Sequence, residues 1–547
     1  MNIPYLQSEH SPKIYLIFNI ALFLIIALGI YLRLNQFLLQ TLMDDEWHAV
    51  NKLLSSSPKE IASSFGHADY SIPLTLFYWL ESKLFGLSEL MMRWPMMLIG
   101  TITLISFPIY AKKHFHLSVV VVFAFFIAVS PVLIEYSRIA RPYAITLFLV
   151  YFSLFLFYKF YNSHEKQLIR GLLYIIIASL AVWLHLIVVF FIAAPFALEL
   201  TKAIFSNNSD KKQYILKLFK LGIPTLLLIC LLTVPPLFND MAAISSKAGN
   251  NIPNIDTLLG FLHLCFGTSS ELLVSVLSIL CLIGLFSLIK KSILALNIIL
   301  GFGLTLLVIF TVQPAWVHIP ITFTRYVLPI MPLILLSSAI GLIQLIHLCT
   351  QSIKNKLLKT GLITGIIIFF VYGIAMHSPL NALLKTPNSN TLHSLFTIDY
   401  RNGENKVKNH MQERSISPFW RTLKDYPSNY KIAVAPWFFE SYNWDAPYWE
   451  ENSKHYIIPG MLIDLCIEKR QGEVPKNHQF KFNNLAYLAD DKDLKSKNIR
   501  WIVYQKPERF KTEVKNKNLE NCQNSLKEKY GNPIFEDGLI AVYKTEL

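Results

Sequence analysis

The sequence predicts a mainly α-helical, polytopic membrane protein of about 11 transmembrane helices, followed by a C-terminal soluble α/β domain. Its 547 residues are 53% hydrophobic and 16% charged, whereas a soluble chain has roughly a quarter charged residues. Long apolar runs follow one another as far as residue 376. Beyond that point, short β-type runs and a Lys/Glu-rich helical stretch replace them.

Eleven apolar runs have the composition of membrane spans, each residue adding about 1.5 Å of helix. The first run has no small-residue cleavage site, so we interpret it as a span rather than a signal peptide. The pair within 171–200 is the weak point, because only Trp183-Leu184-His185 separates two short halves. A single broken helix there would reverse the orientation of every later span. The runs are 14–32, 91–111, 118–134, 142–160, 171–183, 185–200, 215–236, 272–289, 293–312, 325–347 and 359–376.

The distribution of basic residues predicts the orientation of the spans. The formal net charge is +14, and many of the Lys and Arg residues lie in short loops between the apolar runs. We see no soluble basic domain of the kind that binds nucleic acid. Alternate loops are basic, as at Lys112-Lys113 and Lys290-Lys291, and the positive-inside rule places these loops in the cytoplasm. The N-terminus is then cytoplasmic and the C-terminal domain extracytoplasmic. Part of the positive charge can also serve anionic lipid or phosphate ligands.

The first outer loop, about residues 33–90, combines acidic residues with an expected interfacial helix. The triplet Asp44-Asp45-Glu46 follows the first span closely, in a part of the chain where carboxylates are scarce. The aromatic stretch at 73–85 is interrupted by two charged residues, so it predicts a helix lying on the membrane rather than crossing it.

From residue 377 the composition becomes polar and predicts a second domain. We therefore divide the chain into a multi-span domain, residues 1–376, and an extracytoplasmic α/β domain, residues 377–547. Cys466 and Cys522 could pair if this domain lies outside, although the sequence does not show that they are close. An aromatic cluster at 437–449 is typical of core packing or interface anchoring, with a sugar-stacking surface as the alternative. The expected strands are 431–439, 455–458, 500–504 and 538–544, and the expected helix is 507–529.

Unusual polar residues gather in the loops that are predicted to lie outside. Charged side chains beside membrane spans are costly and tend to face protein or a wet cavity. Arginine can hold a phosphate with a two-point fork, and a carboxylate can take a proton from an attacking hydroxyl or hold a divalent metal. Together they predict a site for a lipid-linked phosphosugar. The candidate residues are Asp44, Asp45, Glu46, His67, Arg138, Arg141, Tyr143, His185, Arg325 and Tyr326.

Each of these residues also has a structural interpretation. Loop carboxylates are often merely solvated, although three adjacent ones make this interpretation weaker. Arg138, Arg141 and Arg325 could anchor lipid headgroups at the membrane surface. His67 and His185 could be packing or hydrogen-bonding residues.

The order of several short motifs resembles one family of membrane enzymes. It is similar to the dolichyl-phosphate-mannose protein mannosyltransferase-like family, which includes bacterial aminoarabinose transferases acting on lipid A and belongs to the GT-C membrane glycosyltransferases. The resemblance covers roughly residues 10–350 and rests on motif order and spacing, since no single motif is specific. The motifs are Asp45-Glu46-Trp47, His67 with Pro73-Leu74, Leu84 to Leu90 with Arg93-Trp94-Pro95, Ala140-Arg141-Pro142-Tyr143-Ala144, and Arg325-Tyr326-Val327-Leu328-Pro329 with Pro332.

The resemblance implies an inverting glycosyltransferase, of hexosyl or pentosyl type, in a bacterial inner membrane. It would move a sugar from a polyprenyl-phosphate donor to a hydroxyl of a lipid, glycan or protein acceptor on the outer face. The family pattern leaves the need for a divalent metal open. No nucleotide cofactor and no nucleic-acid partner are expected.

The resemblance also implies roles for individual residues. Asp45 would be the general base or the carboxylate that orients the acceptor, with Glu46 supporting it. Asp44 is an extra acid that the family pattern does not require. Arg141 with Tyr143, and Arg325, match positions where a contact with the donor phosphate is expected.

Two other classes of protein fit parts of the sequence. A secondary transporter or lipid flippase is the main alternative, since eleven spans and intramembrane charges would suit one. Transporters tend to show duplicated halves, whereas here the charges gather at one face and no repeat is visible. A non-catalytic scaffold with a sensory outer domain is the third class.

Overall fold

The computed structural model describes nearly all of the helical part of the chain and the C-terminal part in segments. The described residues are 12–35, 37, 44–66, 70–85, 87, 89–162, 167–205, 211–249, 251–378, 398–399, 404–405, 416–427, 429–435, 449, 452–458, 461–462, 487–488, 494–495, 498–506 and 517–546.

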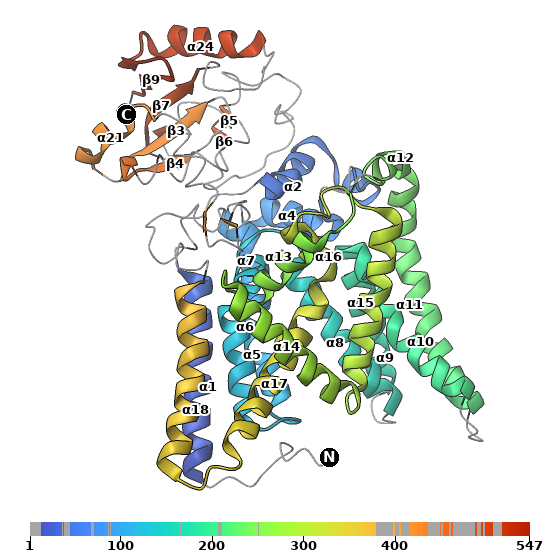
Figure 1. The fold of residues 1–547 in the computed structure, drawn as a ribbon. Coiled ribbons are helices and arrows are strands. Elements are labelled where there is room, and N and C mark those ends of the chain that lie inside the picture. The colour runs from blue at the N-terminus through green and yellow to red at the C-terminus, as the bar shows by residue number, and fades with distance from the viewer. Residues whose placement is uncertain are drawn as a thin grey trace.

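The long helices pack side by side in one bundle (Figure 1). Within the described residues, ten helices are long and apolar enough to cross a membrane, or eleven if the bent pair α6–α7 is one span. This confirms the polytopic helical fold class. The helices are α1 (Pro12–Leu34), α5 (Glu89–Ala111), α6 (Leu117–Val129) with α7 (Pro131–Arg138), α8 (Tyr143–Asn162), α9 (Gln167–Leu184), α10 (Val189–Phe205), α11 (Lys211–Asn239), α14 (Glu271–Ile289), α15 (Ile293–Val312), α17 (Met331–Thr350) and α18 (Lys356–Met376).

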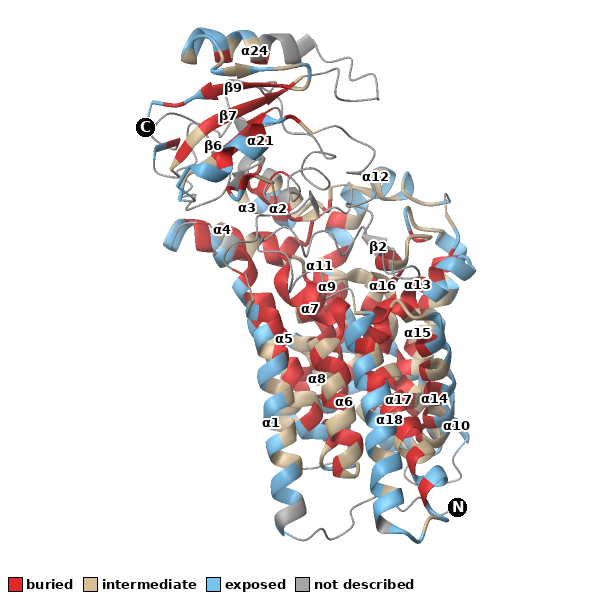
Figure 2. Ribbon diagram, turned by 60° about the vertical axis from the view of Figure 1, so that its left-hand side comes forward, coloured by how far each residue is buried: buried red, intermediate tan, exposed pale blue. Residues whose placement is uncertain are grey.

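Burial is greatest in the middle of the bundle (Figure 2). In the span that contains α17, 78% of the most apolar window is buried, whereas the figure for α1 and for α18 is 11%. The exposed faces of α1 and α18 are apolar, as expected of surfaces that contact lipid tails rather than water.

Helices α14 and α17 approach each other most closely, at two glycines. A Cβ atom on Gly284 would lie 1.9 Å from the Ser337 carbonyl oxygen, and one on Gly341 would lie 2.0 Å from that of Leu280. Only glycine permits such contact between backbones. This contact fixes α17, and α17 directly follows the segment that carries Arg325.

Two breaks interrupt the helices towards one end of the bundle. Pro131 lacks an N–H and disfavours helical geometry at Ser130, so α6 and α7 meet at an angle of 53°. His185 has an extended backbone (φ −153°, ψ 102°), which separates α9 from the 3-10 turn η2 (Leu186–Val188) and α10. The stretch 171–200 therefore forms two helices rather than one.

Short helices gather at the end of the bundle where α2 lies (Figure 1), which we call the Asp45 end because α2 carries Asp45. The opposite end is the Lys113 end, since Lys113 follows the C-terminal end of α5. The acidic triplet, expected in a loop, instead opens a helix, because carboxylates are favourable near the positive end of the helix dipole. The helix expected at 73–85 is present as α4. The short helices are α2 (Asp44–Ser55), α3 (Pro58–Ala62), α4 (Ile72–Leu84), α12 (Met241–Ser245), α13 (Ile255–Phe266) and α16 (Pro320–Val327), with the 3-10 turn η3 (Leu328–Ile330) after α16.

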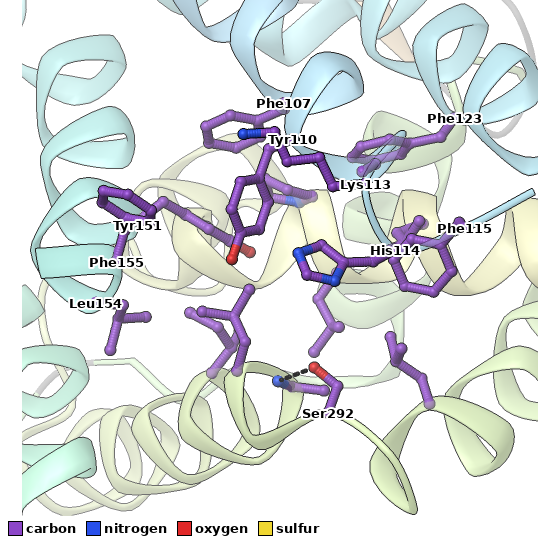
Figure 3. A pocket seen from close by; sticks show the side chains of 18 of the residues that line it. Phe107, Tyr110, Lys113, His114, Phe115, Phe123, Tyr151, Leu154, Phe155 and Ser292 are labelled. Carbon is purple, nitrogen blue, oxygen red and sulfur yellow. Dashed lines mark hydrogen bonds between the residues drawn. The ribbon is translucent and has the colours of Figure 1, made fainter. Parts of the chain in front are cut away.

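A cavity of about 1380 Å³ lies among α5, α6, α8, α15 and α17 and reaches the Lys113 end. Aromatic side chains such as Phe107, Tyr110 and Phe123 line one side of it, and Ser292 lies on the opposite side (Figure 3). The cavity is separate from the residues proposed for chemistry, since none of them lines it.

The C-terminal part contains a five-stranded mixed sheet of order β4-β3-β7-β9-β8. Strand β3 pairs in parallel with β4 and β7, while β9 pairs antiparallel with β7 and β8. Helix α24 (Lys517–Tyr530) connects β7 to β8. The strands are β3 (Lys431–Ala435), β4 (Tyr456–Ile458), β7 (Ile499–Gln505), β8 (Phe535–Glu536) and β9 (Ile540–Lys544); two further pairs are β1 (Ile398–Asp399) with β2 (Glu404–Asn405) and β5 (Met461–Leu462) with β6 (Tyr487–Leu488).

Aromatic packing forms the core of this sheet region. Trp449 is buried and stacks on Trp420, with ring centroids 4.7 Å apart. Trp449 is thus a core residue, whereas residues 437–448 of the aromatic cluster lie outside the described residues. Cys522 is disulfide-bonded, and Cys466 lies outside the described residues.

Candidate active site

The centre of the candidate site is the carboxylate of Asp45, near the N-terminus of α2. Arg325 of α16 donates from Nη1 to Asp45 Oδ2 at 2.9 Å, and the two side chains are 20% and 33% exposed. Arg141, between α7 and α8, donates from Nη1 to the backbone carbonyl of Asp45 at 3.2 Å. Two guanidinium groups from distant parts of the chain therefore meet at Asp45, one at its carboxylate and the other at its backbone carbonyl.

Aromatic rings form the floor of this cluster. The Tyr143 ring lies under both cations, with its centroid 5.8 Å from the Arg141 guanidinium carbon and 5.9 Å from that of Arg325. Such cation–π contacts hold a guanidinium in place while leaving its edge available for hydrogen bonds. His185 packs edge-on to Tyr143 at 5.6 Å and stacks on Tyr326 at 6.1 Å.

His185 is neutral in this environment. Burial, followed by the neighbouring guanidinium groups of Arg141 and Arg325, lowers the pKa of the His185 imidazole from 6.5 to about 3. The imidazole can therefore offer one N–H donor and one acceptor nitrogen near neutral pH, without adding positive charge.

Glu46, the neighbour of Asp45, is held in a buried network. Arg93 of α5 donates from Nε to Glu46 Oε1 at 2.8 Å and from Nη2 to Oε2 at 2.6 Å. The Ala140 N–H also donates to Glu46 Oε1, at 2.5 Å. Both charged side chains are 1% exposed. This two-point pair fixes the start of α2 against the segment that carries Arg141.

Arg138 has a different environment from Arg141. It is fully buried, and its Nη1 group donates to the carbonyls of Leu32, Arg33 and Asn35, at 3.3, 2.9 and 2.6 Å. These carbonyls lie at the C-terminal end of α1, where helical partners are absent. Arg138 therefore holds α1 to α7, and these hydrogen bonds do not involve Asp45.

The structure brings together six of the predicted residues. Asp45, Arg141, Tyr143, His185, Arg325 and Tyr326 are linked by the contacts described above, and Glu46 lies behind Asp45 in the interior. His67 and the side chain of Asp44 lie outside the described residues.

Two residues of the site were not among the candidates. Arg93 is the partner of Glu46, and Tyr136 of α7 packs on Tyr143 with ring centroids 4.7 Å apart. A single Arg inside an otherwise apolar run was a usable signal for Arg93, because a charge there requires a partner. Tyr136 had no such signal among the many aromatic residues of the spans.

The arrangement can bind an anion beside a base. One carboxylate and two guanidinium groups leave a net positive charge, and the Arg325 side chain is 20% exposed. A phosphate oxygen is a suitable acceptor for a guanidinium group. No group of three or more His, Cys, Asp or Glu side chains within the described residues is arranged to hold a metal ion.

Comparisons with known proteins give distant structural similarity only. No family model matches the chain, and no curated protein matches it. The chain is similar to the archaeal oligosaccharyltransferase AglB from Archaeoglobus fulgidus, solved with an inhibitory peptide and a dolichol-phosphate, at 12% identity and a TM-score of 0.44 over 90% of this chain and 70% of AglB.

It is also similar to ArnT from Cupriavidus metallidurans, over 98% of both chains. The TM-score and identity are 0.43 and 9% for the apo state, and 0.42 and 10% for the form bound to undecaprenyl phosphate. Structural similarity at this level does not identify the residues of the site, so we interpret the site from its own geometry.

Proposed function

We propose that this protein is an inverting membrane glycosyltransferase that moves a sugar from a polyprenyl-phosphate donor to an acceptor hydroxyl. The observation that supports this most directly is the accessible Asp45 carboxylate beside Arg141 and Arg325, at one end of a bundle of apolar helices. The acceptor is a lipid, a glycan or a protein.

Asp45 acts as the base in this proposal. Its carboxylate takes the proton of the acceptor hydroxyl as the hydroxyl oxygen forms a bond to the anomeric carbon of the sugar. Attack comes from the face opposite the phosphate, so the configuration at that carbon inverts. The bond between the anomeric carbon and the phosphate oxygen breaks, and its electron pair leaves with the polyprenyl phosphate.

Arg141 and Arg325 stabilise the charge that develops on the departing phosphate. Arg325 pairs with Asp45 through Nη1 while its side chain stays 20% exposed, so the same guanidinium group can also contact a phosphate. The Tyr143 ring fixes the direction of both cations. The neutral imidazole of His185 adds hydrogen-bonding capacity for the sugar or the phosphate.

The location of this chemistry follows from the loop charges. We propose that the Asp45 end faces outwards, with a cytoplasmic N-terminus, in a bacterial inner membrane. Residues 1–376 then form the transmembrane catalytic domain and residues 377–547 an extracytoplasmic domain. The polyprenyl tail lies in the bilayer while its phosphate reaches the Arg residues at the membrane boundary.

The test is a reaction with purified full-length protein. Polyprenyl-phosphate sugars are supplied with a candidate acceptor, and released polyprenyl phosphate is measured by mass spectrometry. We expect release that depends on the acceptor and needs no nucleotide. Absence of release with every donor offered, while the same preparation binds those donors, would overturn the proposal.

A transporter or flippase is the second candidate, and the large cavity that reaches the Lys113 end favours it. Such a protein would move a labelled polyprenyl-phosphate sugar between leaflets of proteoliposomes without breaking its glycosidic bond. Intact lipid recovered from the opposite leaflet, without released polyprenyl phosphate, would support this candidate over the enzyme.

A further inference from the structure

The mouth of the cavity lies at the opposite end of the bundle from the candidate active site, while its inner end reaches Phe148, five residues along α8 from Tyr143. Helix α5 carries Arg93 near its start and the cavity residues towards its other end, and its 23 residues span about 35 Å. On α8 the lining residues run from Phe148 to Asn162, a stretch of about 21 Å. This is longer than one leaflet's share of a hydrocarbon core about 30 Å thick.

The walls of the cavity are apolar. They consist largely of aliphatic and aromatic side chains of α5, α8, α15 and α17, such as Ile105, Phe152, Ile298 and Leu336. A volume of about 1380 Å³ is larger than the roughly 300–1,000 Å³ of an ordinary small-ligand pocket. Hydrocarbon chains suit such a space, whereas a free ion or a small polar metabolite would lose its hydration there.

The mouth of the cavity carries positive charge. Lys113, Lys159 and Lys291 line it at the ends of three neighbouring helices, together with His114. All four side chains are exposed. No Asp or Glu is among the lining residues, and no carboxylate pairs with these lysines in the part of the chain that the structure describes. The charge is therefore available to a ligand.

We propose that this cavity is a binding site for an anionic phospholipid of the leaflet at the Lys113 end. The phosphate contacts the ammonium groups of Lys113, Lys159 and Lys291, and the acyl chains lie between α5, α8 and α17. The combination of cationic mouth and apolar walls matches an amphiphile with a phosphate headgroup. The site is distinct from that of the sugar donor, whose phosphate is bound at the other end of the bundle.

The test compares two phospholipids on the purified full-length protein. Phosphatidylglycerol and phosphatidylcholine with identical acyl chains are added in detergent, and bound lipid is measured by native mass spectrometry. We expect phosphatidylglycerol to bind at least tenfold more tightly than phosphatidylcholine. The triple variant Lys113→Gln/Lys159→Gln/Lys291→Gln should lose roughly a hundredfold in affinity for phosphatidylglycerol, because three cations near the headgroup are removed.

A matched variant controls for the loss of net charge. Lys212→Gln/Lys217→Gln/Lys220→Gln removes three lysines of α11 that do not line the cavity, and it should bind phosphatidylglycerol like the wild type. Equal affinity for the two lipids, or equal effects of the two triple variants, would overturn the proposal. So would displacement of the lipid by millimolar inorganic phosphate, which would indicate a site for a free anion.

A second variant tests the cavity itself without altering the lysines. Ser106 lines the cavity, and its hydroxyl has no hydrogen-bond partner among the described residues. Ser106→Phe should fill part of the space and reduce retention of phosphatidylglycerol severalfold. Unchanged retention would place the lipid on the outer surface of the helices and contradict the proposal. Both outcomes are independent of the transferase reaction, since neither measurement involves transfer.

Discussion

Asp45 and Glu46 are neighbours in the sequence but lie in two different regions of the molecule. Asp45 belongs to an accessible cluster with Arg325 and Arg141, where its carboxylate is one-third exposed. Glu46 points into the interior, where Arg93 and the Ala140 N–H occupy its oxygens. The Asp45 carboxylate is therefore partly exposed at the surface of the cluster, whereas the Glu46 carboxylate is held in the interior.

The difference shows why two adjacent acids need not share a role. A buried and fully paired carboxylate is costly to disturb and cannot readily accept a proton from a substrate. A carboxylate that is one-third exposed beside cations can be substituted at little cost in stability and can contact a ligand. Stability and transfer should therefore respond to different substitutions in the two regions.

The largest expected change in stability comes from the buried region. Arg93→Met leaves the Glu46 carboxylate unpaired in the interior, which should lower the free energy of unfolding by about 3–5 kcal/mol. Thermal unfolding in detergent measures this. The double variant Glu46→Met/Arg93→Met removes both charges and should recover much of the loss. A single variant as stable as the wild type would mean that the pair does not hold α2.

After substitution of Asp45, we expect the largest loss of transfer when a cation of the accessible region is removed. Arg325→Gln should reduce the transfer rate roughly 100- to 1,000-fold, because one donor to the charged transition state is lost. Its unfolding midpoint should stay near that of the wild type. Arg421→Gln, an exposed residue of the C-terminal part, is the matched control and should change neither quantity.

Arg138→Gln should lower stability and leave donor binding unchanged, whereas Arg325→Gln should lower the transfer rate and leave stability unchanged. The Arg138 substitution removes the hydrogen bonds to three carbonyls at the end of α1, so stability should fall by about 1.5–3 kcal/mol while the KM for the donor stays unchanged. A rise in donor KM without loss of stability would place Arg138 in the binding site instead.

A smaller effect concerns the pH dependence of stability. The pKa of His185 is about 3 in the folded protein and 6.5 ordinarily. Between these values the unfolded chain binds a proton that the folded chain does not, so stability should fall as the pH drops from 6.5 towards 3. His185→Gln should flatten this slope when unfolding midpoints are compared across that range. An equally steep slope in the variant would assign the effect to other groups.

Most of the fold could be predicted from the sequence, because apolar run length and loop charge are local properties. The two runs expected within 171–200 are indeed two helices, which are separated by the extended backbone of His185. Helix α2 was missed as a helix. Its acidic start looks like a loop until the helix dipole and the contacts of Glu46 are known.

The candidate site could be predicted only in part. Residue chemistry singled out Asp45, Arg141 and Arg325, but separating them from Arg138 required knowing which groups each guanidinium contacts. The contacts of Arg138 and Arg141 join segments that are about a hundred residues apart in the chain. The role of Arg93 likewise depends on a neighbour on another helix, and sequence spacing does not encode that pairing.

The most direct test of the central claim is the transfer rate of Asp45→Asn, measured with its unfolding midpoint. The substitution keeps the size of the side chain and removes the base, so transfer should fall about 100- to 10,000-fold while insertion and stability persist. A variant that is stable and inactive is the predicted result. Turnover at the wild-type rate would contradict the assignment of Asp45 as the base.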